Sequence, residues 1–131
     1  MKILLVDDHI LFREGLRSLL SRQQNLHIAG TAESIAETVE KARDLKPDLI
    51  LMNFDLADGT GLEATPLILA VCPTTNIVFL TTCDKDERLY EALRFGALGY
   101  LNKSISLNKF LKYIRSIEVD DQATAEPVMI S

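Results

Sequence analysis

The sequence predicts an α/β fold in which a five-stranded parallel sheet is covered by helices on both faces. Short, unbroken apolar runs alternate with segments of helical periodicity, and this alternation occurs five times. Continuous apolar runs are typical of strands that are buried on both faces of a parallel sheet. Right-handed crossovers then distribute the helices over the two faces. The expected architecture is a doubly wound, flavodoxin-like (βα)5 domain, whose strand order does not follow from the sequence.

Each predicted strand is an apolar run that ends in polar residues. The five runs cover residues 2–6, 26–32, 49–53, 76–81 and 99–102. The predicted helices have apolar residues at spacings of three and four. They cover residues 10–22, 35–45, 86–95 and 106–118, with a further helix after residue 61. Ser34, with Glu37 three residues later, has the capping-box pattern of a helix start.

The segment between the third and fourth strands is the least regular. Gly61 starts a helical pattern, but Pro66 follows at an interior position, where proline costs about 3 kcal/mol. Because Thr65-Pro66 resembles a cap followed by a first helical residue, the sequence predicts a kink or a delayed start near Thr65. The next residues are apolar on every face. Either Leu67 and Leu69 are exposed and form a partner or dimer surface, or a kink turns them into the core.

Composition limits the function classes. The chain has 131 residues, 47% hydrophobic residues and a net charge of −5, which suits one domain (residues 1–118) followed by a linker or tail (residues 119–131). The acidic balance disfavours a broad nucleic-acid-binding surface, and no apolar run reaches the roughly 18 residues of a membrane span. Cys72 and Cys83 lack metal-ligand spacing and are expected to be reduced. These features favour a cytoplasmic protein.

Polar residues that suit phosphoryl chemistry stand at the ends of four predicted strands. They are Asp7 and Asp8, Asn53 with Asp55, Thr81, and Lys103. The carboxyl ends of parallel strands meet at one edge of the sheet, where such folds place their ligands. Adjacent carboxylates suit Mg²⁺, whereas a hydroxyl and an ammonium can contact phosphoryl oxygens. A nucleophilic carboxylate is missing, because the third strand ends in Asn53.

The chain resembles a response-regulator receiver domain over residues 2–118. Five short sequence segments carry this resemblance. These strings are ILLVDDH (3–9), PDLILM (47–52), DGTGLEA (58–64), LT (80–81) and GALGYLNK (96–103). The resemblance implies a CheY-like fold, and the opening DDH, GLEAT and GYL strings are most similar to NarL/FixJ regulators. In that class a receiver precedes a LuxR-type helix-turn-helix domain.

The resemblance also assigns roles to single residues. It implies a Mg²⁺ site formed by Asp7, Asp8, the acceptor position Asn53 and the backbone carbonyl of Asp55. It implies that Thr81 and Lys103 contact the phosphoryl group, and that Thr81 and Tyr100 act as switch residues. The chain departs from the family at Asn53, where an aspartate is phosphorylated, and at Ala57, where proline is usual.

An asparagine amide cannot form an acyl phosphate, so Asn53 predicts that ordinary phosphotransfer fails and that Mg²⁺ binding is weakened. Three explanations stay open: a naturally degenerate receiver, a deliberate substitution of aspartate, or phosphorylation of the neighbouring Asp55. Ala57 favours natural divergence, because blocking phosphorylation does not require a change there.

The expected function is therefore that of a signalling domain and not of an enzyme. The resemblance implies the amino-terminal half of a DNA-binding transcriptional regulator. Its partners would be a histidine kinase, engaged non-productively, a second copy in a homodimer, and DNA through a carboxyl-terminal domain outside this chain. The alternative is a phosphorylation-independent pseudo-receiver that acts as a protein-interaction or dimerisation module.

Overall fold

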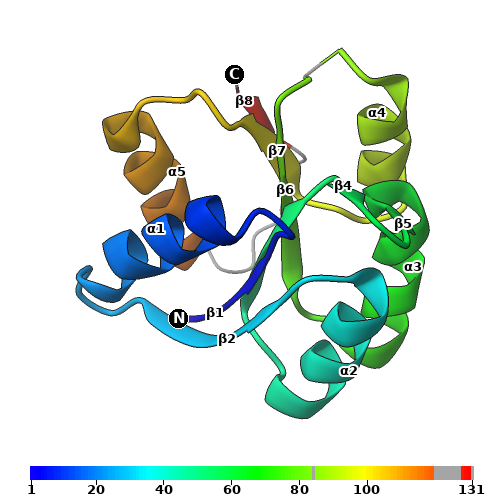
Figure 1. Ribbon diagram of the computed structural model, residues 1–131, viewed down its shortest axis with the longest axis horizontal. Helices are drawn as coiled ribbons and strands as arrows, with labels where there is room; N and C mark the ends of the chain where they lie inside the picture. Colours follow the sequence, from blue (N-terminus) through cyan, green and yellow to red (C-terminus); the bar gives the residue numbers. More distant parts are fainter. Residues whose placement is uncertain (84, 120–127, 131) are drawn as a thin grey trace.

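A six-stranded parallel sheet forms the centre of the protein (Figure 1). The computed structural model describes residues 1–83, 85–119 and 128–130. In spatial order the strands are β2 (His27–Ala32), β1 (Lys2–Val6), β3 (Leu49–Asn53), β6 (Asn76–Thr81), β7 (Gly99–Asn102) and β8 (Val128–Ile130). The five predicted strands and their parallel arrangement are confirmed. No helix of the described residues is both long enough and apolar enough to cross a membrane.

The sixth strand was not expected. β8 pairs in parallel with β7, so that Gly99 lies opposite Val128 and Leu101 opposite Ile130. It falls within the predicted linker or tail, whose residues 120–127 and 131 lie outside the described residues. Three residues without a sustained pattern carry too little signal to predict a strand. The proposed domain boundary at residue 118 stays a prediction.

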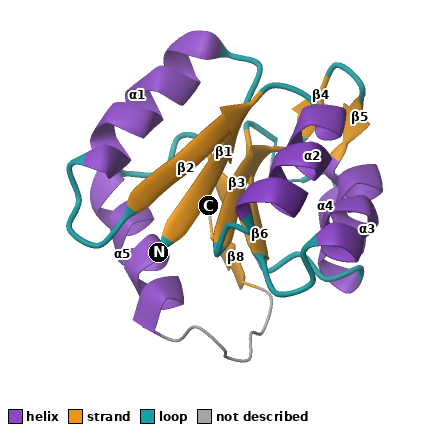
Figure 2. Ribbon diagram, turned by 90° about the horizontal axis from the view of Figure 1, so that it is seen from below, coloured by secondary structure: helices purple, strands orange, loops and turns teal. Residues whose placement is uncertain are grey.

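The helices cover both faces of the sheet, as predicted (Figure 2). One face carries α1 (Ile10–Ser21) and α5 (Leu107–Val119), and the other carries α2 (Ile35–Leu45), α3 (Gly61–Val71) and α4 (Glu87–Arg94). Side chains of β1 alternate between the two cores: Ile3 and Leu5 pack beneath α1 and α5, and Leu4 and Val6 pack on the other side. This two-sided burial explains the unbroken apolar runs.

The predicted delayed start of the third helix is wrong. α3 runs without a break from Gly61, and the Thr60 hydroxyl caps it by accepting a hydrogen bond from the Leu62 N–H. Pro66 lies inside the helix, so the bond that its N–H would have made is missing. Burial of Ala64 and Ile68 on the core face offsets this cost. A kink at Pro66 stays a prediction.

The two leucines of α3 differ in exposure. Leu67 is 52% exposed, which agrees with the surface hypothesis. Leu69 is partly buried and packs against the core, close to Gly96. The apolar segment therefore divides between surface and core.

A small antiparallel hairpin, formed by β4 (Asp55–Leu56) and β5 (Gly59–Thr60), follows Asn53 and was not predicted. Gly59 adopts φ +147°, and a Cβ at this position would collide with Glu63 and Ile35. Between the strands, Asp58 accepts hydrogen bonds from the backbone N–H groups of Ile35 and Ala36 at the start of α2. The hairpin thus ties the loop after Asn53 to a neighbouring helix.

Candidate functional site

The predicted site residues meet at the carboxyl edge of the sheet, around a hollow of about 370 Å³. It is lined by Asp8, His9, Asn53, Asp55, Leu56, Ala57, Thr81, Thr82 and Lys103. Strand pairing explains this convergence, because Asn53 lies opposite Leu80 and Thr81 lies opposite Asn102. Asp7 lies behind the lining, and Tyr100 does not line the hollow.

Asp7 and Lys103 form a buried ion pair. Only 2% of Asp7 is exposed, and its Oδ2 accepts a hydrogen bond from Lys103 Nζ at 2.8 Å. Its other oxygen accepts a hydrogen bond from the backbone N–H of His9 at 2.9 Å. Lys103 Nζ also lies 4.4 Å from the centroid of the Phe12 ring. The burial cost of each charge is therefore compensated by its partner.

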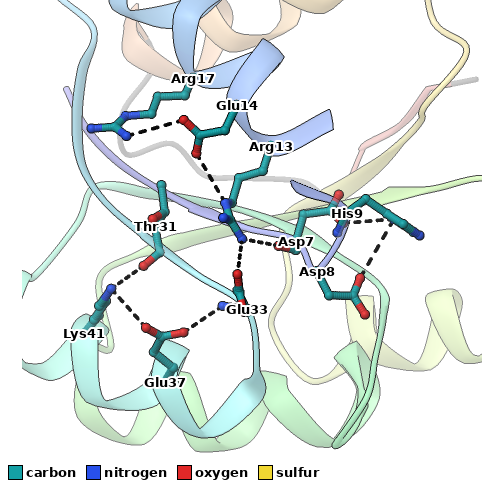
Figure 3. Close-up of polar contacts among 10 residues, drawn as sticks. All are labelled: Asp7, Asp8, His9, Arg13, Glu14, Arg17, Thr31, Glu33, Glu37 and Lys41. Atoms are coloured by element: carbon teal, nitrogen blue, oxygen red, sulfur yellow. Dashed lines mark hydrogen bonds and ion pairs between the residues drawn. The ribbon is translucent and has the colours of Figure 1, made fainter. Parts of the chain in front are cut away.

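Asp8 is the more accessible acid, with a side chain that is 40% exposed. Figure 3 shows Asp7, Asp8 and His9 together at the end of β1. His9 is the N-cap residue of α1, and its ring also joins the site. The His9 Nδ1 lies 3.1 Å from Asp7 Oδ1 and 3.8 Å from Asp8 Oδ1. Ligand atoms of these three residues lie within 4.8 Å of one another, a spacing that one cation could bridge. Sequence reasoning missed this contact, although His9 directly follows the acidic pair.

Arg13 connects the end of β1 to the loop before α2 (Figure 3). Its Nη1 donates hydrogen bonds to the Asp7 carbonyl at 2.9 Å and to Glu33 Oε1 at 3.0 Å. The Glu33 N–H in turn donates to Glu37, and this bond, together with the ion pair to Lys41, lowers the pKa of Glu37. Sequence reasoning missed this contact of Arg13, because spacing within one helix cannot reveal a contact with a loop 20 residues away.

Asn53 is 7% exposed, and its Nδ2 donates a hydrogen bond to the backbone carbonyl of Asp55 at 2.8 Å. This carbonyl was predicted to be a metal ligand. An ionised aspartate has no N–H to donate, so this contact requires the amide. Asn53 therefore lacks the negative charge of an aspartate, and its amide also occupies the Asp55 carbonyl, which was predicted to bind the metal.

Thr81 is 4% exposed, and its hydroxyl is engaged in the turn that follows β6. It accepts a hydrogen bond from the Cys83 N–H at 3.0 Å and donates one to the Cys83 carbonyl at 3.1 Å. Tyr100 is 5% exposed and packs edge-on against Tyr90, with ring centroids 6.3 Å apart. The position of Tyr100 on a strand next to the site is consistent with the switch role, which stays a prediction.

The donor set fits Mg²⁺ with one carboxylate fewer than the family pattern implies. Mg²⁺ favours a few hard oxygen ligands plus water molecules. Asp8 offers an accessible carboxylate, whereas Asp7 is paired with Lys103 and the Asp55 carbonyl accepts from Asn53. A bound ion would supply positive charge beside the acceptor position. The chain's own Lys103 already supplies such charge there.

A family model for the response regulator receiver domain matches residues 3–115. The chain is similar to the transcriptional regulatory protein LnrK of Bacillus subtilis, with 37% identity over 89% of this chain and 53% of the relative. It is also similar to the response regulator GacA of Pseudomonas syringae, with 38% identity over 89% of this chain and 55% of the relative. The chain thus spans about half the length of these curated relatives.

A solved structure agrees with these matches. The signal receiver domain of NarL from Mycobacterium tuberculosis superimposes with a TM-score of 0.81 and 25% identity. The similarity covers 88% of this chain and 93% of that one. Sequence and fold therefore point to the same family.

Proposed function

The chain belongs to the response regulator receiver domain family, and from this premise we propose that it is a receiver in which Asn53 blocks phosphorylation. Transfer from a phosphohistidine requires a carboxylate oxygen to attack phosphorus. The Asn53 amide is a poor nucleophile, and its Nδ2 is held by the Asp55 carbonyl. That hydrogen bond is the observation that carries the proposal. Asp55 is a weak substitute, because its side chain is 66% exposed and its Oδ1 lies 3.7 Å from the Arg88 guanidinium, whereas Asn53 is buried.

We extend the proposal to a longer regulator, because the relatives that this chain matches include a transcriptional regulatory protein of which the match covers only 53%. The chain would be the amino-terminal half of a cytoplasmic transcription factor and would reach DNA through a carboxyl-terminal domain. A histidine kinase would dock without productive transfer. The domain would act in signalling and not as an enzyme.

The test compares the wild-type protein with Asn53→Asp after incubation with Mg²⁺ and acetyl phosphate, using intact-protein mass spectrometry. We expect no phosphoryl adduct on the wild type and a stoichiometric adduct on Asn53→Asp. Asp55→Asn is the matched control for the neighbouring acid. An adduct on the wild type that disappears in Asp55→Asn would assign the acceptor to Asp55. If Asn53→Asp acquires no phosphoryl adduct, the site lacks a further requirement for phosphorylation besides the acceptor carboxylate.

The alternative, a protein-interaction or dimerisation module, is favoured by the exposed Leu67 on α3. A half-exposed leucine at the centre of an apolar helix suits an interface. Leu67→Glu would shift the sedimentation coefficient of a dimer toward that of a monomer. An unchanged oligomeric state would remove this surface from consideration.

A further inference from the structure

Helices α1 and α5 cover one face of the sheet (Figures 1 and 2). Residues of both helices line a second hollow on this face. It is open to solvent on one side and has a volume of about 170 Å³. Its lining is Phe12, Leu16, Leu19, Leu80, Asn102, Lys103, Ile105, Leu107 and Phe110. We refer to this feature as the α1–α5 groove. The phosphoryl chemistry described above assigns no role to this groove.

The size of the groove selects a small occupant. An apolar cavity of about 150 Å³ is known to hold benzene, whereas pockets for larger ligands have volumes of roughly 300–1,000 Å³. The groove, at about 170 Å³, matches a single ring. Phe12 and Phe110 offer ring surfaces for such a group.

Lys103 offers a hydrogen-bond donor to an anion in the groove. Lys103 is the only ionisable residue among the nine that line it. An ammonium has three N–H donors; one goes to Asp7 Oδ2 at 2.8 Å, and Nζ also lies 3.4 Å from His9 Nδ1. A carboxylate at the rim could therefore accept a charge-assisted hydrogen bond from Lys103 without displacing Asp7.

We propose that the α1–α5 groove binds a small-molecule monocyclic aryl carboxylate, with the ring between the helices and the carboxylate at Lys103. Lys103 also lines the hollow at the acceptor position, so the two sites share one side chain. This inference goes beyond the proposed function and does not depend on it, because Asn53 is not part of the groove.

The test is a titration of the protein with phenylacetate, followed by two-dimensional amide and methyl NMR. Benzyl alcohol and phenethylamine serve as neutral and cationic controls of similar size. We expect shifts to concentrate at Leu16, Leu19, Ile105 and Phe110. Phenylacetate should bind on the order of tenfold more tightly than either control, as one charge-assisted hydrogen bond predicts.

Leu107 offers a matched pair of variants. It is 48% exposed and is the first residue of α5, where Glu and Gln are both tolerated by the helix. Leu107→Glu should weaken phenylacetate binding about fivefold relative to Leu107→Gln, through repulsion between carboxylates at short range. The two variants should bind benzyl alcohol equally. Thermal melts of both variants verify that they are folded.

Three results would overturn the proposal. Equal affinity for phenylacetate and benzyl alcohol would exclude the role of Lys103. Shifts outside the groove, or no shifts, would exclude the site. Concentration-dependent broadening over α1 and α5 without any probe would instead identify this face as an interface between copies of the chain.

Discussion

The two sides of the acceptor hollow differ in charge. On one side, Asp7 at the end of β1 forms a buried pair at 2.8 Å with Lys103, which follows β7 and reaches across the strand ends. On the β3 side, Asn53 is neutral and donates to a backbone carbonyl. The charged pair therefore persists beside a position that lacks its reactive carboxylate. We therefore expect the folded protein to depend on each member of the Asp7–Lys103 pair, because removing one leaves the other charge buried without its partner.

The largest effect on stability is expected for Lys103→Met, which removes the cation of the Asp7–Lys103 pair. The substitution leaves the Asp7 carboxylate buried without its cation, which typically costs about 3–5 kcal/mol. Urea unfolding measures the loss. Arg17→Met is the control, because Arg17 pairs with Glu14 at 3.6 Å on the surface, where such pairs contribute about 0–1 kcal/mol. Equal losses in the two variants would contradict a stabilising role for the buried pair.

Asn53→Asp would place charge on both sides of the hollow. The new carboxylate would lie near Asp7 and Asp8, so the variant should be less stable than the wild type without Mg²⁺. Mg²⁺ at 100 times its dissociation constant should add about 2.7 kcal/mol to the free energy of unfolding. The wild type should gain less at the same concentration, because it lacks this ligand. Urea titrations with and without Mg²⁺ measure both quantities, and equal gains would show that Asn53 does not weaken the site.

Asp58→Ala tests whether the hydrogen bonds between Asp58 and the start of α2 stabilise the protein, whichever residue stands at position 53. Hydrogen bonds from the backbone N–H groups of Ile35 and Ala36 lower the pKa of Asp58 below its ordinary value. The contribution of Asp58 is therefore present above the unfolded-state pKa and is lost as the pH falls through the lower folded-state pKa. We expect the variant to lose about 1 kcal/mol at neutral pH, as for other helix caps.

The difference between wild type and Asp58→Ala should shrink in urea titrations carried out below the ordinary aspartate pKa of 3.8. Asp44→Ala provides the control, because Asp44 is exposed near the carboxyl end of α2. A carboxylate is unfavourable at that end of a helix, so its removal should not destabilise the protein. A pH-independent loss in Asp58→Ala would contradict the capping role.

The same contrast explains what the sequence could predict. Strand ends, and hence Asp8, Asn53, Thr81 and Lys103, follow from apolar runs that stop at polar residues. The contacts of His9 and Arg13 depend on how α1 sits on the sheet, which a one-dimensional pattern does not contain. α3 continues through Pro66 because tertiary burial outweighs local propensity. The Asn53 hydrogen bond depends on a hairpin of only two residues per strand.

The smallest expected effect concerns Tyr113, a buried residue of α5 in the apolar cluster on the α1 and α5 side of the sheet. Unlike Asp7, its hydroxyl has no hydrogen-bond partner among the described residues. Burial also raises the pKa of Tyr113 to about 12, from an ordinary value of 10.0. Below pH 10.0 the hydroxyl is neutral in both states, and the free energy of unfolding falls as the pH rises from 10.0 through about 12, because the unfolded chain ionises first.

Tyr113→Phe should therefore leave the free energy of unfolding unchanged at neutral pH, or raise it by up to roughly 1 kcal/mol, because it removes an unpaired buried hydroxyl. The free energy of unfolding of the variant should also fall less steeply than that of the wild type between pH 10.0 and about 12. Urea midpoints across this range measure both effects, and Tyr90 and Tyr100 are common to the two proteins and cancel in the difference. A loss at neutral pH would mean that the Tyr113 hydroxyl is satisfied in solution. Tyr113 would then no longer serve as the unpaired buried group with which the paired Asp7 is compared.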